Sequence, residues 1–212
     1  MGSNASDSAP IPYRQIRASY NKDTITVYQA YSSTIALPAV KEQKLDASPD
    51  FRLSRMTWVK PSWAWMMYRS GYSYKDTRQA HILAIKMKHE HFLHMLSLAV
   101  LTHDISTVAT STELRGKDEH VKVQWDPERT PALGKLPYRS IQIGIPVALI
   151  EQWVDNWIVG IEDVTERARA LKTALDENSN LTIEELIQRR LVPEERLYEL
   201  SDDLQKVLHM SG

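Results

Sequence analysis

The sequence predicts an α+β fold: a single compact domain with a mixed or antiparallel sheet, followed by a helical C-terminal tail. Short β-branched and aromatic runs with period-two patterning alternate with amphipathic segments, and neither an internal repeat nor a long linker interrupts them. With 212 residues and 42% apolar content, the chain is long enough to bury one sizeable core. We therefore expect residues 11–212 to form one α+β domain behind a disordered N-terminal tail, residues 1–10.

Strand-like and helix-like runs alternate through the first half of the chain. ITVYQA is rich in β-branched and aromatic residues, and Ser32 and Ser33 behind it can cap a helix. The tryptophan-rich run that follows predicts a strand that either turns at Lys60–Pro61 or leads into a short helical turn. In chain order, the predicted elements are a strand at 25–30, a helix from 33 towards 44, the strand beginning at 56, a strand at 80–87 and a helix at 89–101.

The second half adds two strands of alternating pattern and then mainly helices. Pro146 favours the start of a helix, because proline fits the first helical turn. Glu184 and Glu185, which follow Thr182, give another helix an acidic first turn that complements its dipole. The predicted elements are strands at 120–125 and 140–145, a helix at 147–156, a strand at 157–164, and helices at 165–177, 182–190 and 193–208.

The run RMTWVKPSWAWMMYRSG, residues 55–71, alternates large rings with cations. Aromatic faces beside Arg or Lys suit a planar or anionic ligand, through stacking, cation–π contact and phosphate pairing. The alternative is a buried strand whose rings pack in the core while its charged tips reach water. The alternation favours a ligand site. That interpretation assigns binding to Trp58, Lys60, Trp63, Tyr68 and Arg69.

Polar residues in other segments are candidates for the same site. Arg14 and Arg17 precede the first strand and can either clamp a phosphate or pair with surface carboxylates. Tyr28 and Gln29 lie inside the first strand, and Gln142 lies between two isoleucines of a later strand. A polar side chain on the inward face of a strand needs a hydrogen-bond partner, which is either another protein group or a ligand.

Composition excludes several classes of function. Cysteine is absent, which excludes disulfides, thiolate catalysis and cysteine-ligated metals. The net charge of −1 gives no bulk attraction to nucleic acid or to an anionic membrane. No run approaches the roughly 20 apolar residues that span a bilayer, and neither a Walker loop nor a GxGxxG motif is present. His89, His91 and His94 lack HExxH spacing, so they predict a solvated helix start and no metal site.

The N-terminal residues MGSNASDSAP contain no apolar signal segment, so an intracellular location, cytoplasmic or nuclear, is expected. They do fit the Met-Gly-x-x-x-Ser pattern for myristoylation of Gly2. A disordered native tail or a cloning remnant is the favoured interpretation of the same residues.

Six motifs in a fixed order carry a resemblance to a known family. They are YRQIRASY, VYQAYS, RMTWVKPSWAWMMYRSG, VQWDPER, YRSIQIG and WIVGIEDVT. Together they resemble domain-of-unknown-function family 4291 over about residues 11–200. The resemblance implies a family but no activity.

At the level of topology the chain also resembles divergent ADP-ribosyltransferases. VYQAYSSTIA is similar to the first strand and helix of that superfamily, and RSIQIGIPVALIEQW to its late strand, proline and helix. There, an Arg or His on the first strand holds NAD, and a Glu on the late strand faces the nicotinamide ribose. Here Tyr28–Gln29 and Gln142 occupy those places, so Arg14 or Arg17 must supply the first role. Gln142 can hydrogen-bond a ribose hydroxyl but brings no charge.

The transferase resemblance implies NAD as substrate, no metal, and an acceptor that is a protein, a nucleic acid or a small molecule. Gln142 would orient the ribose, and Glu128 would be the nearest base, unless it only pairs with Arg129. The pyrophosphate would be held by Arg14, Arg17, Lys60 and Arg69, and the rings that stack on the ligand would come from Trp58, Trp63, Tyr28 or Tyr68.

Two other classes fit the same residues. One is a nucleic-acid-binding module that uses the rings and arginines as a stacking platform. The other is a small-molecule enzyme of secondary metabolism, in which the rings line a hydrophobic pocket and the arginines point away from it.

Overall fold

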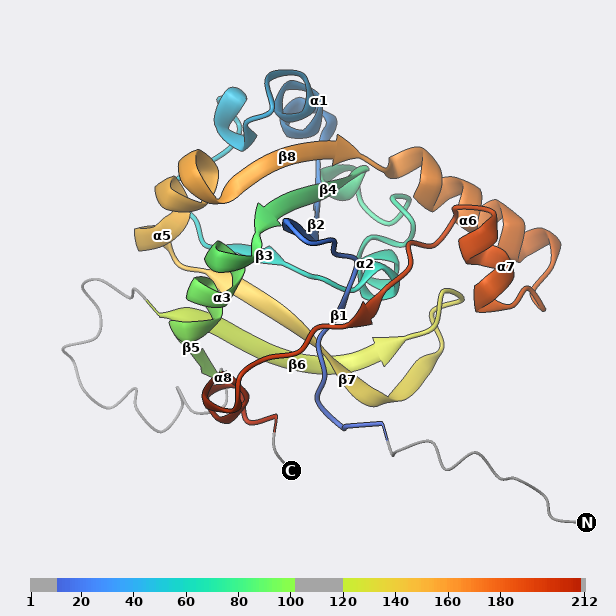
Figure 1. Ribbon diagram of the computed structural model, residues 1–212. Coiled ribbons are helices and arrows are strands. Elements are labelled where there is room, and N and C mark those ends of the chain that lie inside the picture. Colours follow the sequence, from blue (N-terminus) through green and yellow to red (C-terminus); the bar gives the residue numbers. More distant parts are fainter. Residues whose placement is uncertain (1–10, 102–119, 211–212) are drawn as a thin grey trace, which may run out of the picture.

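Two β-sheets form the centre of the molecule (Figure 1). The computed structural model describes residues 11–101 and 120–210, so the tail expected at residues 1–10 lies outside it. One sheet is antiparallel, with strand order β2–β4–β8; the other is mixed, with order β3–β7–β6–β5 and a parallel β5–β6 pair. The expected α+β domain is confirmed. The strands are β2 Thr24–Tyr31, β3 Thr57–Val59, β4 His81–Lys88, β5 Ala99–Leu101, β6 Val121–Arg129, β7 Lys135–Ile145 and β8 Ile158–Asp163.

A short backbone bridge joins the two sheets. Tyr28 N on β2 donates a hydrogen bond to Lys60 O at 2.7 Å, and Lys60 N donates to Tyr28 O at 3.1 Å. Lys60 follows directly after β3, so the strands run β5–β6–β7–β3–β2–β4–β8 across the junction. The bridge places β2 next to β3, and β3 next to β7.

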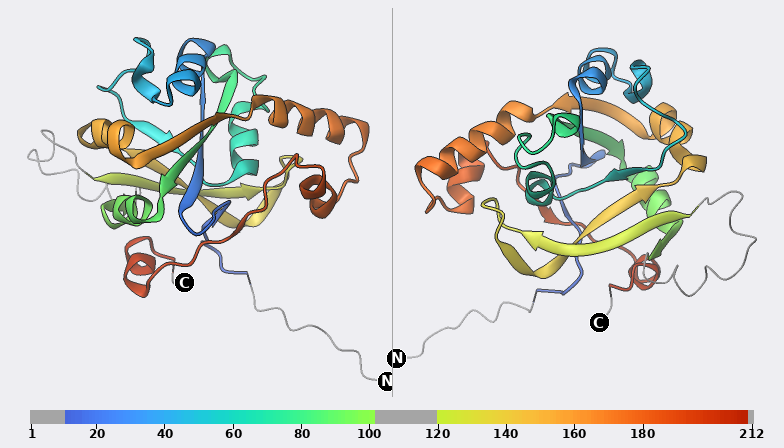
Figure 2. Two further views of the ribbon diagram at one scale, coloured as in Figure 1. Left: turned by 45° about the horizontal axis from the view of Figure 1, so that its top comes forward. Right: turned by 180° about the vertical axis from the view of Figure 1, so that it is seen from behind.

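Helices cover the outer faces of this arrangement. Helix α1 lies over β8 and β4, and the amide of Gln43 at its end exchanges two hydrogen bonds of 2.9 Å with the backbone of Ile161 (Figure 1). Helices α6 and α7 project to one side of the sheets (Figure 2). The helices and helical turns are α1 Ser33–Glu42, η1 Leu45–Ala47, α2 Trp63–Ser70, η2 Thr77–Gln79, α3 His89–Ser97, α5 Val147–Gln152, the π-helical turn η4 Trp153–Trp157, α6 Thr165–Glu177 and α7 Ile183–Gln188.

The C-terminal segment is a correction to the predicted helical tail. Residues predicted as one helix from 193 to 208 are extended up to Ser201, and only α8, Asp202–Val207, is helical. Within this segment β9, Arg196–Leu197, pairs antiparallel with β1, Arg17–Ala18. Tyr198 and Leu200 are buried while Glu199 between them is exposed. Burial of alternate residues against the N-terminal segment therefore overrides local helix propensity.

The buried side chains form two clusters. The larger one lies between the sheets and under α3 and α5, with Val27, Ile85, Ile143 and Trp153 fully buried. The smaller one packs under α2, α6 and α7 and contains Tyr28, Trp63, Met66, Met67 and Leu186 among its members. Successive residues of β2 therefore belong to different clusters, which puts Gln29 on the opposite face of the strand from Tyr28. In the described part of the chain, no helix is long and apolar enough to cross a membrane.

Candidate functional site

A cavity of about 760 Å³ lies where β2, β3 and β7 meet. Its walls come from the end of β2, the start of α1, the segment 49–56 and strand β3, with two residues each from α2 and η2 and single residues from β6 and β7. The volume falls within the range of small-molecule pockets in proteins. The lining residues that carry its chemistry are Gln29, Trp58, Lys60, Arg69, Gln124 and Gln142.

Strand alternation places two of the glutamine amides in the cavity. Ile141 and Ile143 on β7 are buried in the larger cluster, so Gln142 between them faces the other side of the sheet. Gln124 on β6 is its cross-strand partner and lines the same cavity. The two amides therefore lie side by side on one face, where each offers both a donor and an acceptor.

The third amide, that of Gln29, has an oxygen without a partner. Gln29 Nε2 donates to Thr57 Oγ1 at 2.6 Å and to Trp58 O at 3.1 Å. A carbonyl oxygen can only accept, so the contact with Trp58 O fixes which end of the amide is the NH₂ group. Gln29 is only 3% exposed, and its buried Oε1 meets no donor among the described residues.

The charges on the wall are mostly positive. Five cationic side chains line the cavity against the single carboxylate of Asp50. Arg78 is partly neutralised by Asp76. The hydrogen bonds that Arg78 donates lower the pKa of the Asp76 carboxyl group to about 2. The other cations are Arg52, Arg55, Lys60 and Arg69. A basic, partly enclosed wall favours an anionic ligand such as a phosphate.

Lys60 is the buried member of this set. The residue is 4% exposed, and its Nζ lies 4.5 Å from the centre of the Trp65 ring. Burial lowers the pKa of the Lys60 amine to about 8, and the nearby Arg69 charge acts in the same direction. A substantial fraction of the amine is therefore neutral near physiological pH.

Of the predicted site residues, the structure brings Trp58, Lys60, Arg69 and Gln142 together in this cavity. Tyr68 does not line it: its exposed ring lies 3.8 Å from the Arg129 guanidinium.

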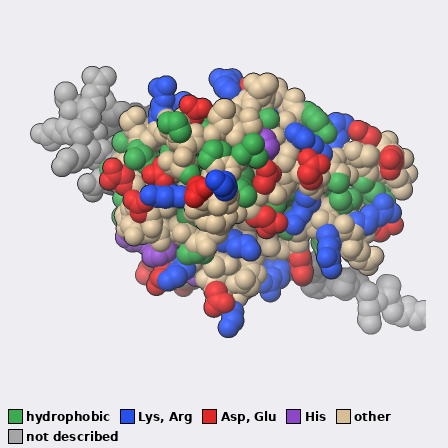
Figure 3. All heavy atoms as spheres, turned by 90° about the horizontal axis from the view of Figure 1, so that it is seen from above, with side chains coloured by type: hydrophobic (Ala, Val, Ile, Leu, Met, Phe, Trp, Pro, Cys, Tyr) green, Lys and Arg blue, Asp and Glu red, His purple; other side chains and the backbone are tan. Residues whose placement is uncertain are grey.

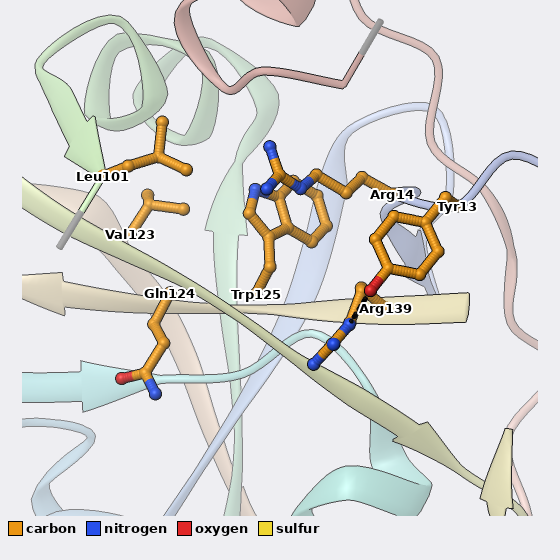
Figure 4. A pocket seen from close by; sticks show the side chains of 7 residues that line it. All are labelled: Tyr13, Arg14, Leu101, Val123, Gln124, Trp125 and Arg139. Atoms are coloured by element: carbon orange, nitrogen blue, oxygen red, sulfur yellow. Dashed lines mark hydrogen bonds between the residues drawn. The ribbon is translucent and has the colours of Figure 1, made fainter. Parts of the chain in front are cut away.

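The two N-terminal arginines do not line this cavity. Arg14 lines a separate pocket of about 120 Å³ and donates a hydrogen bond to His209 O at 2.7 Å (Figure 4). Gln124 and Trp125 both contribute to this pocket, and Figure 4 shows their side chains pointing to opposite sides of β6. Arg17 on β1 donates to Glu195 O at 3.1 Å. Both arginines therefore donate hydrogen bonds to the C-terminal segment, and they do not form the predicted phosphate clamp at this cavity.

Tyr28 and Trp63 are core residues rather than ligand contacts. They are 2% and 0% exposed, and their rings pack edge to face at 5.3 Å in the smaller cluster. Burial raises the pKa of the Tyr28 hydroxyl above its usual value. For Trp63 the alternative interpretation of the run 55–71, rings that pack in the core, fits its position, and Tyr28 is buried beside it.

Glu128 lies at the start of α2, outside the cavity. It is 5% exposed, and its Oε1 accepts hydrogen bonds from Ser62 Oγ at 2.9 Å and from Arg129 N at 2.8 Å. Glu195 accepts from Trp63 N at 2.6 Å at the same helix end. Burial raises the pKa of both carboxyl groups, that of Glu195 to about 8. Glu128 is therefore a buried structural acceptor and not a base that faces a ligand.

The three neighbouring histidines of α3 contact aromatic rings. His89 hydrogen-bonds the Tyr198 hydroxyl at 2.9 Å and stacks on its ring, while His91 and His94 both contact Trp157. Across residues 11–101 and 120–210, no group of three or more His, Asp or Glu side chains is placed to hold a metal ion.

Sequence reasoning assigned no role at the site to Gln124, Arg52 or Arg78. In VKVQW, residues 121–125, the alternation predicts that Gln124 faces away from the buried valines. Its position on the cavity face could therefore have been predicted from the sequence. The two arginines come from irregular segments, which carry no periodicity that could place them.

Comparison with models of protein families matches residues 15–198 to one family, described as Domain of unknown function (DUF4291). The match includes β2, β3, β6 and β7, which line the cavity, and confirms the resemblance carried by the six motifs. No curated protein matches the chain.

Proposed function

We propose that this chain, which belongs to the DUF4291 family, is an NAD-binding enzyme of the ADP-ribosyltransferase type. One observation carries the proposal: Gln29 from an early strand and Gln142 from a late strand face a single basic cavity of about 760 Å³. In an ADP-ribosyltransferase, NAD lies between the first strand and a late strand. The strand order β6–β7–β3–β2–β4–β8 supports the same topology, because it brings those two strands to either side of β3.

The cavity wall suits the chemical groups of NAD. Arg69 and Arg55 can pair with the pyrophosphate, which favours charge-assisted, bidentate contacts. The Trp58 indole offers a face on which a planar base can stack. The Gln142 amide, which lines the cavity, offers both a donor and an acceptor to the polar groups of such a ligand.

In the proposed reaction, Gln142 hydrogen-bonds a ribose hydroxyl beside the glycosidic bond. That bond breaks, nicotinamide leaves with the bonding electrons, and an acceptor nucleophile forms the new bond to the ribose carbon. Because Gln142 is neutral, it orients the sugar but does not stabilise the positive charge of the oxocarbenium-like transition state. We therefore expect cleavage of the glycosidic bond to be slow. Tyr28 and Glu128 take no part, since both are buried outside the cavity.

The nucleic-acid alternative has less support. An exposed platform of rings is required for base stacking, but Trp63 and Trp65 are 0% and 8% exposed. On the face shown in Figure 3, acidic and basic side chains are interspersed, with no continuous basic surface for a phosphate backbone. The small-molecule alternative required arginines that point away from the pocket, whereas four arginines line it.

A thermal-shift titration tests NAD binding. A ligand that binds only the folded state at about 100 times its dissociation constant stabilises it by about 2.7 kcal/mol, which is readily measured. We expect NAD and ADP-ribose to raise the melting temperature and nicotinamide to be released slowly, as detected by chromatography. Absence of a shift at millimolar NAD, with a salt-sensitive shift from an oligonucleotide, would favour the nucleic-acid function instead.

A further inference from the structure

The position of the Lys60 amine is fixed from two sides. Its backbone is held by the two hydrogen bonds to Tyr28, its Nζ lies 4.5 Å from the centre of the Trp65 ring, and the residue lines the cavity. Within the described chain, the amine has neither a hydrogen bond nor a carboxylate within ion-pairing distance. The Trp65 ring and the charge of Asp126 both favour the ammonium form, but the loss of hydration outweighs them and lowers the pKa of the amine.

A second cation makes the charged form still less favourable. Arg69 lies close enough for its charge to act on the Lys60 amine, and both residues line the same cavity. Desolvation and a neighbouring cation are the two means by which proteins convert lysine into a nucleophile. By contrast, the Lys22 and Lys41 side chains are 90% and 82% exposed.

We propose that the Lys60 amine is a nucleophile that forms an imine with phosphorylated aldehydes or ketones bound in this cavity. The arginines select the phosphate and the amine receives the carbonyl carbon. Imine formation at Lys60 requires no NAD and is independent of the proposed transferase activity.

The step balances without a further reactant. The neutral amine adds to the carbonyl carbon, and one proton passes from the nitrogen to the oxygen to give a carbinolamine. The carbinolamine hydroxyl is then protonated and leaves as water, while the nitrogen lone pair forms the double bond to carbon and the nitrogen gives up its second proton. One amine and one carbonyl compound thus give one imine and one water, with no oxidation or reduction.

Asp126 is a carboxylate whose charge acts on the Lys60 amine. Along β6 it follows Gln124 by two residues and therefore lies on the same face of the strand. Gln124 Nε2 donates to its Oδ1 at 3.2 Å, while its buried Oδ2 has no partner among the described residues. Its charge favours the ammonium form of Lys60, against the effects of burial and Arg69, and burial raises the pKa of its own carboxyl group.

Reductive trapping tests the proposal on the unmodified protein. Pyridoxal 5′-phosphate, which carries an aldehyde and a phosphate, is added at about pH 7.5 with borohydride, and the labelled peptides are identified by mass spectrometry. At that pH, an amine with a pKa near 8 has a neutral fraction on the order of a hundredfold above that of an ordinary lysine. We expect Lys60 to be labelled at least about tenfold faster than Lys22 or Lys41 in the same sample.

Three further measurements complete the test: the pH profile of labelling, labelling by pyridoxal in place of pyridoxal 5′-phosphate, and labelling of the variant Arg69→Gln. Labelling of Lys60 should have its midpoint near pH 8 and should be faster with pyridoxal 5′-phosphate than with pyridoxal, which lacks the phosphate. Arg69→Gln should move that midpoint upward, because it removes the neighbouring charge. Labelling of Lys60 no faster than that of Lys22, or a midpoint like that of the surface lysines, would overturn the proposal. Neither result depends on whether NAD binds.

Discussion

The indole of Trp58 lies across Gly144, its partner on β7: a Cβ atom built at Gly144 would come within 3.0 Å of the ring. Real Cβ atoms rarely approach so closely, so only glycine leaves room for the ring in this position. Since Trp58 lines the cavity, the missing side chain at Gly144 helps to set the shape of its wall.

We predict that Gly144→Ala weakens NAD binding. The added methyl group displaces the Trp58 ring, so the affinity for NAD should fall about tenfold, equivalent to about 1.4 kcal/mol. Overpacking at a buried position should also lower the free energy of unfolding by about 1–3 kcal/mol. Isothermal titration calorimetry and urea denaturation measure the two effects separately.

Gly160→Ala is the matched control. Gly160 also lies in a strand, β8, but the nearest atoms to an added Cβ are side-chain carbons of Lys86 at an ordinary 3.8 Å. The control should change neither NAD affinity nor stability by more than about 1 kcal/mol. Equal losses of affinity in the two variants would exclude Trp58 as part of the NAD wall.

We predict that Gln142→Glu accelerates release of nicotinamide from NAD. A carboxylate beside the breaking bond would stabilise the positive charge that Gln142 leaves unstabilised, and electrostatic groups of this kind change rates by about 100-fold or more. The measurement is the single-turnover rate at saturating NAD. Gln142→Leu, which removes the hydrogen bond to the ribose, should be slower than the natural chain. A Glu variant no faster than the natural chain would place the reacting ribose elsewhere.

Local periodicity predicts the strands and the residues that alternate on them. Gln142 faces the cavity because its isoleucine neighbours are buried, a pattern that five residues of sequence contain. The helix Thr165–Glu177 follows equally from its amphipathic pattern. The tryptophan-rich run left two alternatives open. One was a strand that turns at Lys60–Pro61, and the other was a strand that leads into a short helical turn. The structure has the helical turn, α2, which is capped where Ser62 Oγ accepts from Trp65 N at 3.1 Å.

Long-range pairing is the part that sequence patterns miss. Arg17 pairs with Leu197 across the β1–β9 contact, and nothing in either two-residue strand signals the other. Arg14 and Arg17 are therefore held at the C-terminal segment, although their spacing also fits a phosphate clamp. In the same way, the rings of Trp63 and Tyr28 turn into the core because α2 packs against β2, a contact that composition alone does not specify.

We predict that Arg69→Ala weakens NAD binding while the fold stays intact. Arg69 is exposed at the end of α2 and lines the cavity, so its loss leaves no buried partner unpaired and should change stability by less than about 1 kcal/mol. Loss of a charge-assisted contact to the pyrophosphate should cost about 1.5–3 kcal/mol of binding free energy. The control, Arg189→Ala, removes an exposed arginine just after α7 and should leave binding unchanged. Reduced stability with unaltered affinity would make Arg69 a structural residue.

The carboxyl group of Glu195 makes stability depend on pH. Burial raises its pKa to about 8, and the charge of Glu128 adds to the effect, whereas Arg17 opposes it. In the unfolded chain a glutamate titrates near pH 4.3. Between these values the folded state binds more protons than the unfolded state, so this stabilising contribution is complete below about pH 4.3 and is lost as the pH rises through about 8.

We therefore predict that the free energy of unfolding falls between about pH 5.5 and pH 8.5, by on the order of 2 kcal/mol after allowance for the partial exposure of Glu195. Glu195→Gln retains an oxygen that accepts the Trp63 N–H but cannot ionise, so its decline over the same interval should be clearly smaller. Any decline that remains in the variant would come from other groups, of which Glu128 is the nearest with a raised pKa. Urea denaturation of both proteins at the two pH values measures the difference. If the two proteins lose the same stability, Glu195 is already ionised in the folded state at pH 5.5, and its carboxyl group at the start of α2 is not the source of the pH dependence.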